Sequence, residues 1–194
     1  MSAQDRITGF LRAAAIRFGT HDSDIARTIS RALQGTYPTA PALAPATLGA
    51  CAPLPGMLAE APDDLTRRLA VCLSDLHWRC AGFGKLAPGT GQKLAVVEII
   101  GPTGMFHASC LRFGLLIQHE GFHYPHHRHA AEELYFILKG TADWAVDDCP
   151  HAPRTPGEFV HHASLQPHGM ITRREPMLAM WGWVGDIGGA SYST

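Results

Sequence analysis

The chain has 194 residues, 46% of them hydrophobic and 17% charged, which suits one soluble domain with a sizeable buried core. Its formal net charge of −1 excludes a strongly basic face for nucleic acid or an anionic membrane, so we expect neither partner. Five cysteines without a Cys-x-x-Cys pair argue against a disulfide framework and a thiolate zinc site. The 12 histidines are unusual, and nine of them fall between His119 and His168, which suggests metal or proton chemistry there.

The first third of the chain is predicted to be helical. The spacing of apolar residues indicates amphipathic helices within residues 2–18, 23–34 and 61–78, the second capped by Ser23. Residues 36–56 are rich in proline and alanine and lack periodicity, so we expect an extended connector there. The N-terminus lacks an apolar core with a cleavage site, and no apolar run approaches the roughly 20 residues that span a bilayer. We therefore expect a cytoplasmic protein.

From about Cys80 onward, short segments rich in β-branched and aromatic residues alternate with polar turns. These segments cover residues 93–100, 110–118, 133–140, 141–148, 157–164, 169–174 and 178–185. Strands that recur at short intervals without intervening helices are typical of an antiparallel sandwich or barrel. We therefore expect a mainly β fold, with a helical N-terminal region over residues 1–79 and a β-barrel over residues 80–194.

The densest group of polar side chains lies in GFHYPHHRHAAEELYFILKG, residues 121–140. On a strand, His127 and His129 project from the same face because side chains alternate. Glu133 follows four residues later and can return its carboxylate to the same pocket, and Tyr135 shares the face of Glu133. Two imidazoles and one carboxylate suit a single divalent transition metal ion such as Fe, Mn, Ni, Co or Zn.

A fourth ligand is expected from elsewhere in the barrel. We choose His168, which follows a proline and begins a predicted strand. His161 and His162 lie in another predicted strand, where only one of the two can face inward. That inward histidine is the competing fourth ligand.

This stretch resembles the first conserved motif of the cupin superfamily, which reads Gly, five residues, His-x-His, three residues, Glu, six residues, Gly. The matching residues are Gly121, His127, His129, Glu133 and Gly140. Pro156, Gly157 and His168 look like the second motif, although the spacing there departs from that of typical cupins. The resemblance implies a small antiparallel barrel, or jelly roll, with the metal held inside its mouth.

A finer resemblance includes two tyrosines. Tyr124, His127, His129, Glu133 and Tyr135 form a pattern that is similar to that of the cupin-type dimethylsulfoniopropionate lyases. Those enzymes cleave this osmolyte to dimethyl sulfide and acrylate. The likeness extends over residues 60–188 and includes a helical N-terminal region, as in the DddQ-like group.

The lyase resemblance implies a base-catalysed β-elimination on a small sulfonium carboxylate. A metal bound to the substrate carboxylate would stabilise the enolate-like transition state. Tyr135 is the first candidate for the base and Tyr124 the second, because nearby positive charge lowers the pKa of a phenol. The sulfonium group needs an apolar pocket with aromatic faces, for which the candidates are Trp181, Trp183, Phe122 and Tyr192.

Two other functions stay open at this stage. Cupin dioxygenases and isomerases also use three histidines and a glutamate as metal ligands. Their substrates are larger and often phosphorylated or aromatic. The other alternative is a non-catalytic, ligand-binding cupin, although no helix-turn-helix is apparent in the first third. The helical region could cover the mouth of the barrel or mediate a homodimer.

Overall fold

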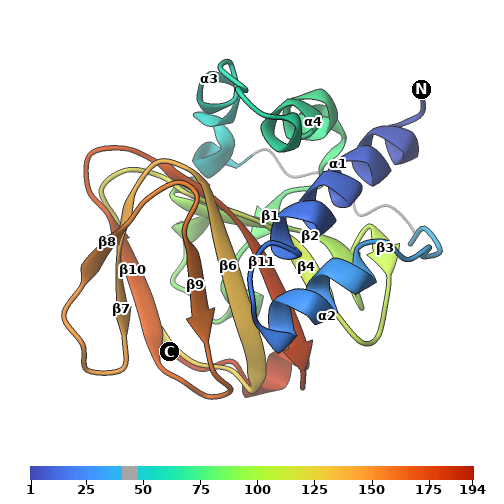
Figure 1. Cartoon of the computed structure of the whole chain (residues 1–194). Coiled ribbons are helices and arrows are strands. Elements are labelled where there is room, and N and C mark those ends of the chain that lie inside the picture. The colour runs from blue at the N-terminus through green and yellow to red at the C-terminus, as the bar shows by residue number, and fades with distance from the viewer. Residues whose placement is uncertain (41–47) are drawn as a thin grey trace.

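A computed structural model describes residues 1–40 and 48–194, which form two facing β-sheets with helices on one side (Figure 1). The larger sheet has the order β1-β2-β4-β11-β6-β9, with β3 beside β2. Its strands are β1 (Arg79–Cys80), β2 (Leu94–Gly101), β3 (Phe106–His107), β4 (Arg112–Gln118), β6 (Ala131–Lys139), β9 (Phe159–His162) and β11 (Met177–Gly185). The smaller sheet has the order β5-β10-β7-β8 and contains β5 (Phe122–His127), β7 (Ala142–Val146), β8 (Ala152–Arg154) and β10 (His168–Thr172). All described pairings are antiparallel except β2 with β3, which confirms the predicted antiparallel jelly roll.

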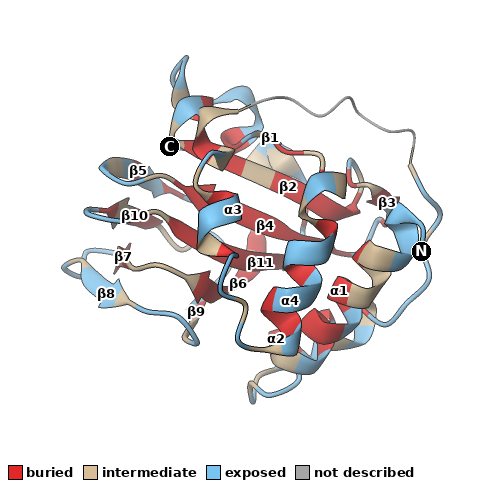
Figure 2. Cartoon of the chain, turned by 90° about the horizontal axis from the view of Figure 1, so that it is seen from above, coloured by how far each residue is buried: buried red, intermediate tan, exposed pale blue. Residues whose placement is uncertain are grey.

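Three helices cover the face of the larger sheet that points away from the smaller one (Figures 1 and 2). They are α1 (Ala3–Phe18), α2 (Asp24–Ala32) and α4 (Asp64–Cys72), and each begins after a capping side chain: Ser2, Ser23 and Asp63. The three predicted helices are therefore confirmed. The third is shorter than predicted, because Asp63 caps it and a 3₁₀ turn, η2 (Leu73–Asp75), follows it. None of the described helices is both long and apolar enough to cross a membrane.

The predicted connector, residues 36–56, is only partly extended. Residues 41–47 lie outside the described residues. The prediction is wrong for the second half, which folds into η1 (Gly49–Cys51) and a one-turn helix, α3 (Leu54–Met57). Proline is compatible with the first turn of a helix because that turn does not need its N–H, and the turns bury Ala50 and Leu54 in the core.

Strand β6 is buried on both faces, which explains its continuous apolar run. Leu134, Phe136 and Leu138 pack in the core between the larger sheet and the helices. Tyr135 and Ile137 point the other way, into a second core between the two sheets. The helices and the larger sheet thus share one apolar core, and the division into two units at residue 79 stays a prediction.

Each of the seven predicted strand segments contains a strand. The segments leave out β1, β3 and β8, which are two or three residues long, and β5, which lies in the histidine-rich stretch 121–140. The turn after β6 requires the glycine of the motif. Gly140 has a φ of +69°, and a Cβ there would lie 1.9 Å from the Pro176 carbonyl oxygen. Any other residue would be strained at this φ and would clash with Pro176.

The remaining short 3₁₀ turns are η3 (Gly82–Gly84), η4 (Thr90–Gln92) and η5 (Gly189–Ser191). Of these, η3 follows β1 directly and brings the backbone over the gap between the sheets, next to residues near the C-terminus. It therefore forms one wall of the site described below.

Candidate active site

The four predicted ligands meet between the two sheets. His127 ends β5, His129 follows two residues later, Glu133 lies in β6 and His168 begins β10, and all four are buried. Nitrogen atoms of His127, His129 and His168 lie within 4.8 Å of one another. Glu133 Oε2 lies 3.2 Å from both His129 Nε2 and His168 Nε2. The structure therefore brings together all four residues chosen from the sequence.

Backbone carbonyls fix the orientation of the three imidazoles. Nδ1 lies 3.0 Å from Pro125 O in His127, 3.0 Å from Ala131 O in His129 and 2.9 Å from Gln166 O in His168. A carbonyl only accepts, so each Nδ1 carries the proton and each Nε2 keeps a free lone pair. His168 Nε2 is buried and has no hydrogen-bond partner among the described residues. Three such nitrogens and one carboxylate oxygen fit a divalent transition metal ion.

The charges of the cluster suit cation binding as well. Burial acts to raise the pKa of Glu133, but the neighbouring imidazoles of His129 and His168 outweigh it and hold that pKa well below its usual value. Burial, assisted by His168, lowers the pKa of His127 to about 3. At neutral pH the cluster thus contains a carboxylate and a neutral imidazole, the forms that coordinate a metal.

A cavity opens beside this cluster, and three tyrosines line it. Tyr124 and Tyr135 are buried, and Tyr192 comes from the C-terminal segment. The hydroxyl oxygens of Tyr124 and Tyr192 lie 3.0 Å apart in a hydrogen bond. In the protein alone, burial raises the pKa of Tyr124 and Tyr135 well above the usual value and that of Tyr192 to about 12.

The residues predicted to contact a substrate separate into two groups. Trp181 and Trp183 lie two residues apart on β11, so both face the cavity, and Tyr192 lines it with them. Phe122 is half-buried at the start of β5 and is not among the side chains that line this cavity in the described part of the chain. The structure therefore brings three of these four aromatic residues to the predicted ligands.

One wall of the cavity was missed from the sequence. Residues 79–83 line it, and Phe83 places its ring 5.7 Å from that of Trp183 and 5.8 Å from that of Tyr192. Phe83 has a left-handed backbone, with φ of +52°, and is 42% exposed. The flanking glycines Gly82 and Gly84 were the only local signal of a special turn, and they do not reveal its long-range contacts.

The structure also distinguishes the two histidines that compete with His168 for the position of fourth ligand. His161 faces outward, and its Nε2 lies 2.7 Å from Glu132 Oε1. His162 faces inward, is fully buried, and stacks on His168 with ring centroids 3.9 Å apart and planes 6° apart. Burial, with a further contribution from His168, lowers the pKa of His162 well below its usual value. His162 is therefore a neutral imidazole in contact with the predicted ligands.

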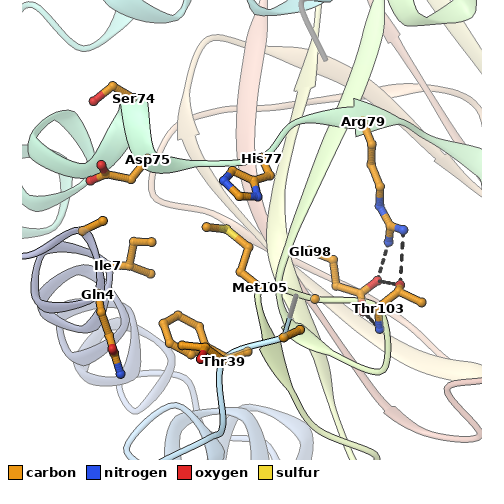
Figure 3. A pocket seen from close by; sticks show the side chains of 14 residues that line it. Gln4, Ile7, Thr39, Ser74, Asp75, His77, Arg79, Glu98, Thr103 and Met105 are labelled. Carbon is orange, nitrogen blue, oxygen red and sulfur yellow. Dashed lines mark hydrogen bonds and ion pairs between the residues drawn. The ribbon is translucent and has the colours of Figure 1, made fainter. Parts of the chain in front are cut away.

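A larger cavity of about 450 Å³ lies elsewhere, between the start of α1, η2 and the β2–β3 region (Figure 3). Its charged side chains already have partners: Asp75 pairs with Arg6, while Glu98 pairs with Arg79 and Arg112. It contains no group of metal-ligating side chains like that between the sheets, as far as the described residues extend. The buried group of metal-ligating side chains therefore adjoins the smaller cavity rather than this one.

Two facing antiparallel sheets with a His-x-His-x₃-Glu group and a distant histidine buried between them define a cupin-type enzyme centre. The chain belongs to the dimethylsulfoniopropionate lyase family, whose model matches residues 21–179. It is 32% identical over 142 residues to the dimethylsulfoniopropionate lyase DddQ of Ruegeria pomeroyi, covering 69% of this chain and 71% of that one. The chain is therefore a lyase.

Solved structures agree with this assignment. The crystal structure of DMSP lyase DddQ from Ruegeria pomeroyi superposes with a TM-score of 0.72 at 25% identity, covering 95% of both chains. A chain from the crystal structures of the DMSP lyases RdDddP and RnDddQII gives a TM-score of 0.77 at 24% identity, covering 100% of this chain and 99% of that one. The latter match includes the whole helical region as well as both sheets.

Proposed function

We propose that this lyase cleaves dimethylsulfoniopropionate to dimethyl sulfide and acrylate by β-elimination, with one divalent transition metal ion held by His127, His129, Glu133 and His168. The observation that carries the proposal is the buried group of free imidazole lone pairs and one carboxylate, which adjoins a cavity lined by three phenols. Membership of the lyase family favours this reaction over the dioxygenase, isomerase and ligand-binding alternatives.

The metal ligands supply binding and orientation of the substrate carboxylate. When bound, a divalent cation would supply Lewis-acid chemistry, drawing electron density from that carboxylate. Trp183 donates its indole N–H to Glu133 Oε1 at 2.7 Å, which leaves Oε2 turned toward the imidazoles. The carboxylate end of the substrate is therefore directed toward the floor of the cavity, and its sulfonium end toward the aromatic wall.

Tyr135 is the base in this proposal, because it lies two residues beyond Glu133 on the same face of β6 and lines the cavity. Its phenolate takes the proton from the carbon next to the carboxylate. The released electron pair forms the new C=C bond, and the C–S bond breaks with its electrons on sulfur, giving acrylate and neutral dimethyl sulfide. Burial raises the pKa of Tyr135 in the protein alone, and positive charge in the loaded cavity acts in the opposite direction.

Tyr124 is the second candidate for the base and takes a positioning role here. Its hydroxyl is hydrogen-bonded to Tyr192, and its ring stacks on that of His127 at 4.2 Å. These contacts hold the phenol at the edge of the ligand cluster. It can therefore orient the substrate carboxylate or share the proton that Tyr135 removes.

The aromatic wall suits the sulfonium group. A sulfonium has no hydrogen-bond donor of its own, and it is bound best by apolar surfaces and π faces. Trp181, Trp183 and Tyr192 supply these faces, and Phe83 adds a fourth ring from η3. Phe122 lies outside this wall, and we propose no contact between it and the substrate.

Headspace gas chromatography for dimethyl sulfide tests the proposal. The purified chain is loaded in turn with Fe²⁺, Mn²⁺, Co²⁺, Ni²⁺ or Zn²⁺ and incubated with dimethylsulfoniopropionate. We expect metal-dependent release that Tyr135→Phe reduces by roughly 10²- to 10⁴-fold, the usual contribution of a general base. Tyr37→Phe is the matched control, since Tyr37 lies in the helical region and donates to Ala32 O. No release with any metal, in folded and metal-loaded protein, would refute the reaction; full activity of Tyr135→Phe would refute only the base.

A further inference from the structure

Trp144 and His162 are hydrogen-bonded across the two sheets. Trp144, on β7 of the smaller sheet, places its indole Nε1 3.1 Å from Nε2 of His162, on β9 of the larger sheet. Both side chains are buried. An indole N–H only donates, so His162 Nε2 accepts and carries no proton. The proton of the neutral imidazole is therefore on Nδ1.

That second nitrogen has no hydrogen-bond partner. His162 Nδ1 is buried, and the part of the chain that the structure describes offers it no acceptor. A buried N–H without an acceptor costs roughly 1–3 kcal/mol, so native proteins keep few of them. An unpaired donor at this position calls for an acceptor that arrives with a ligand or forms when the centre is loaded.

His162 lies directly against the predicted ligands. Its ring stacks on His168, and its Cα is paired with that of Glu133 across β9 and β6. Nitrogens of His162 and His168 and a carboxylate oxygen of Glu133 all lie within 4.8 Å of one another. Nε2 nevertheless gives its lone pair to Trp144, and Nδ1 carries a proton. Neither nitrogen of His162 is free to coordinate, although the residue touches the cluster.

We infer that His162 is a positioning residue of the metal centre, fixed by Trp144 in its Nδ1–H form. The inference rests on the proposed function, because it requires that the cluster binds a metal. The ring of His162 supports the plane of His168, and its Nδ1–H is left to donate to an acceptor that would arrive with the metal or the substrate. Groups that orient ligands in this way commonly change metal affinity about 10- to 100-fold when they are replaced.

Zn²⁺ affinity, measured by competition with a chromophoric chelator, tests this role without using the reaction. His162→Phe keeps an aromatic ring but loses both nitrogens, and we expect it to weaken binding by about 10- to 100-fold. His162→Gln can accept from Trp144 and donate through its amide, so we expect it to restore most of the affinity. Trp144→Phe removes only the donor to His162 and should weaken binding to a smaller extent.

A double variant tests whether Trp144 affects metal binding through His162 or independently of it. If Trp144 acts through His162, the double variant Trp144→Phe/His162→Phe should bind Zn²⁺ as His162→Phe does, rather than with the sum of the two losses. Co²⁺ spectra supply a second readout. The d–d bands should keep their positions in all variants at saturation, because His162 is not a ligand.

Each contrary result has its own meaning. Unchanged affinity in both His162→Phe and Trp144→Phe would overturn the inference and leave His162 as core packing. A changed Co²⁺ spectrum in His162→Phe would overturn it in favour of direct coordination. If His162→Phe fails to fold, the Zn²⁺ affinity of Trp144→Phe tests the role instead. Weaker binding would then support the role of His162, and unchanged binding would overturn it. Absence of Zn²⁺ binding by the unsubstituted chain would refute the metal centre itself, and this role with it.

Discussion

Trp183 donates its indole N–H to Oε1 of Glu133 over 2.7 Å, and the two residues face each other across strands β11 and β6. The same indole forms part of the cavity wall. One side chain thus orients a proposed metal ligand and shapes the proposed substrate pocket. The nearby Trp181 lines the same cavity, but its Nε1 is buried without a hydrogen-bond partner among the described residues.

This difference predicts that Trp183→Phe destabilises the metal-free chain more than Trp181→Phe does. The first substitution removes a buried hydrogen bond to a carboxylate, which contributes about 1.5–3 kcal/mol. The second removes a donor that has no partner, while the loss of ring volume is the same in both. Urea unfolding of the two variants measures the difference in free energy. Equal destabilisation would show that the bond to Glu133 contributes nothing.

The hydrogen bond between Tyr124 and Tyr192 predicts coupled kinetic effects. Tyr124→Phe and Tyr192→Phe each remove the same bond, which typically contributes about 0.5–1.5 kcal/mol. We expect each to raise KM for dimethylsulfoniopropionate by roughly tenfold or less, with a far smaller effect on kcat than Tyr135→Phe. The double variant should resemble either single variant, since the bond is lost only once. A kcat loss in Tyr124→Phe that matches Tyr135→Phe would transfer the role of the base to Tyr124.

The sequence revealed those parts of the site that lie close together along the chain. His127, His129 and Glu133 fall within seven residues, so side-chain alternation and one motif were enough to place them on one wall. The continuous burial of β6 likewise followed from its composition. His168 was chosen because it follows a proline and begins a predicted strand, and the resemblance to a known family then supported the choice.

The parts that were missed, or left open as between His161 and His162, depend on register and long-range packing. His162 meets Glu133 only because β9 pairs with β6 in one particular register, and a shift of one residue would turn His161 inward. Phe83 reaches Trp183 and Tyr192, about a hundred residues later, through a left-handed turn. Contacts between residues so far apart in the chain leave no periodic pattern in the local sequence. The folded turns after residue 48 were missed because proline-rich sequence does not show periodicity even where it packs against a core.

The buried ion pair beside the larger cavity predicts a large loss of stability in Glu98→Gln. Glu98 is 3% exposed, and its carboxylate accepts from Arg112 Nη1 at 2.6 Å, while Arg112 itself is 6% exposed. Removing one partner leaves a buried guanidinium without its counter-charge, which costs about 3–5 kcal/mol. The exposed pair Arg68–Asp64 is the control, and Asp64→Asn should cost only about 0.3–0.5 kcal/mol. Thermal or urea unfolding measures both, and similar losses would contradict the prediction.

The contact between α1 and η2 predicts an acid-sensitive contribution to folding. A hydrogen bond and ion pair with Arg6, at 2.6 Å, lower the pKa of Asp75 below its ordinary value of 3.8. A depressed pKa adds stability above the unfolded-state pKa, and this stability is lost as pH falls through the lower, folded-state value. The unsubstituted chain should therefore exceed Asp75→Asn in urea midpoint at pH 6, and the two midpoints should converge as the pH falls below 3.8 and through the lower, folded-state pKa of Asp75. Parallel curves across this range would exclude the linkage.

Metal binding predicts a rise in stability that depends on Glu133 but not on its neighbour Glu132. A metal that binds only the folded chain adds RT ln(1 + [metal]/Kd) to its free energy of unfolding, which is about 2.7 kcal/mol at a hundredfold excess over Kd. Glu132 is paired with the outward His161, so Glu132→Ala should keep this gain. Glu133→Ala loses the carboxylate that lies 3.2 Å from both His129 and His168 and should lose most of the gain, whatever its stability without metal. Differential scanning calorimetry with and without Zn²⁺ measures the change in Tm. An equal rise in both variants would mean that the metal stabilises the chain from somewhere other than this cluster.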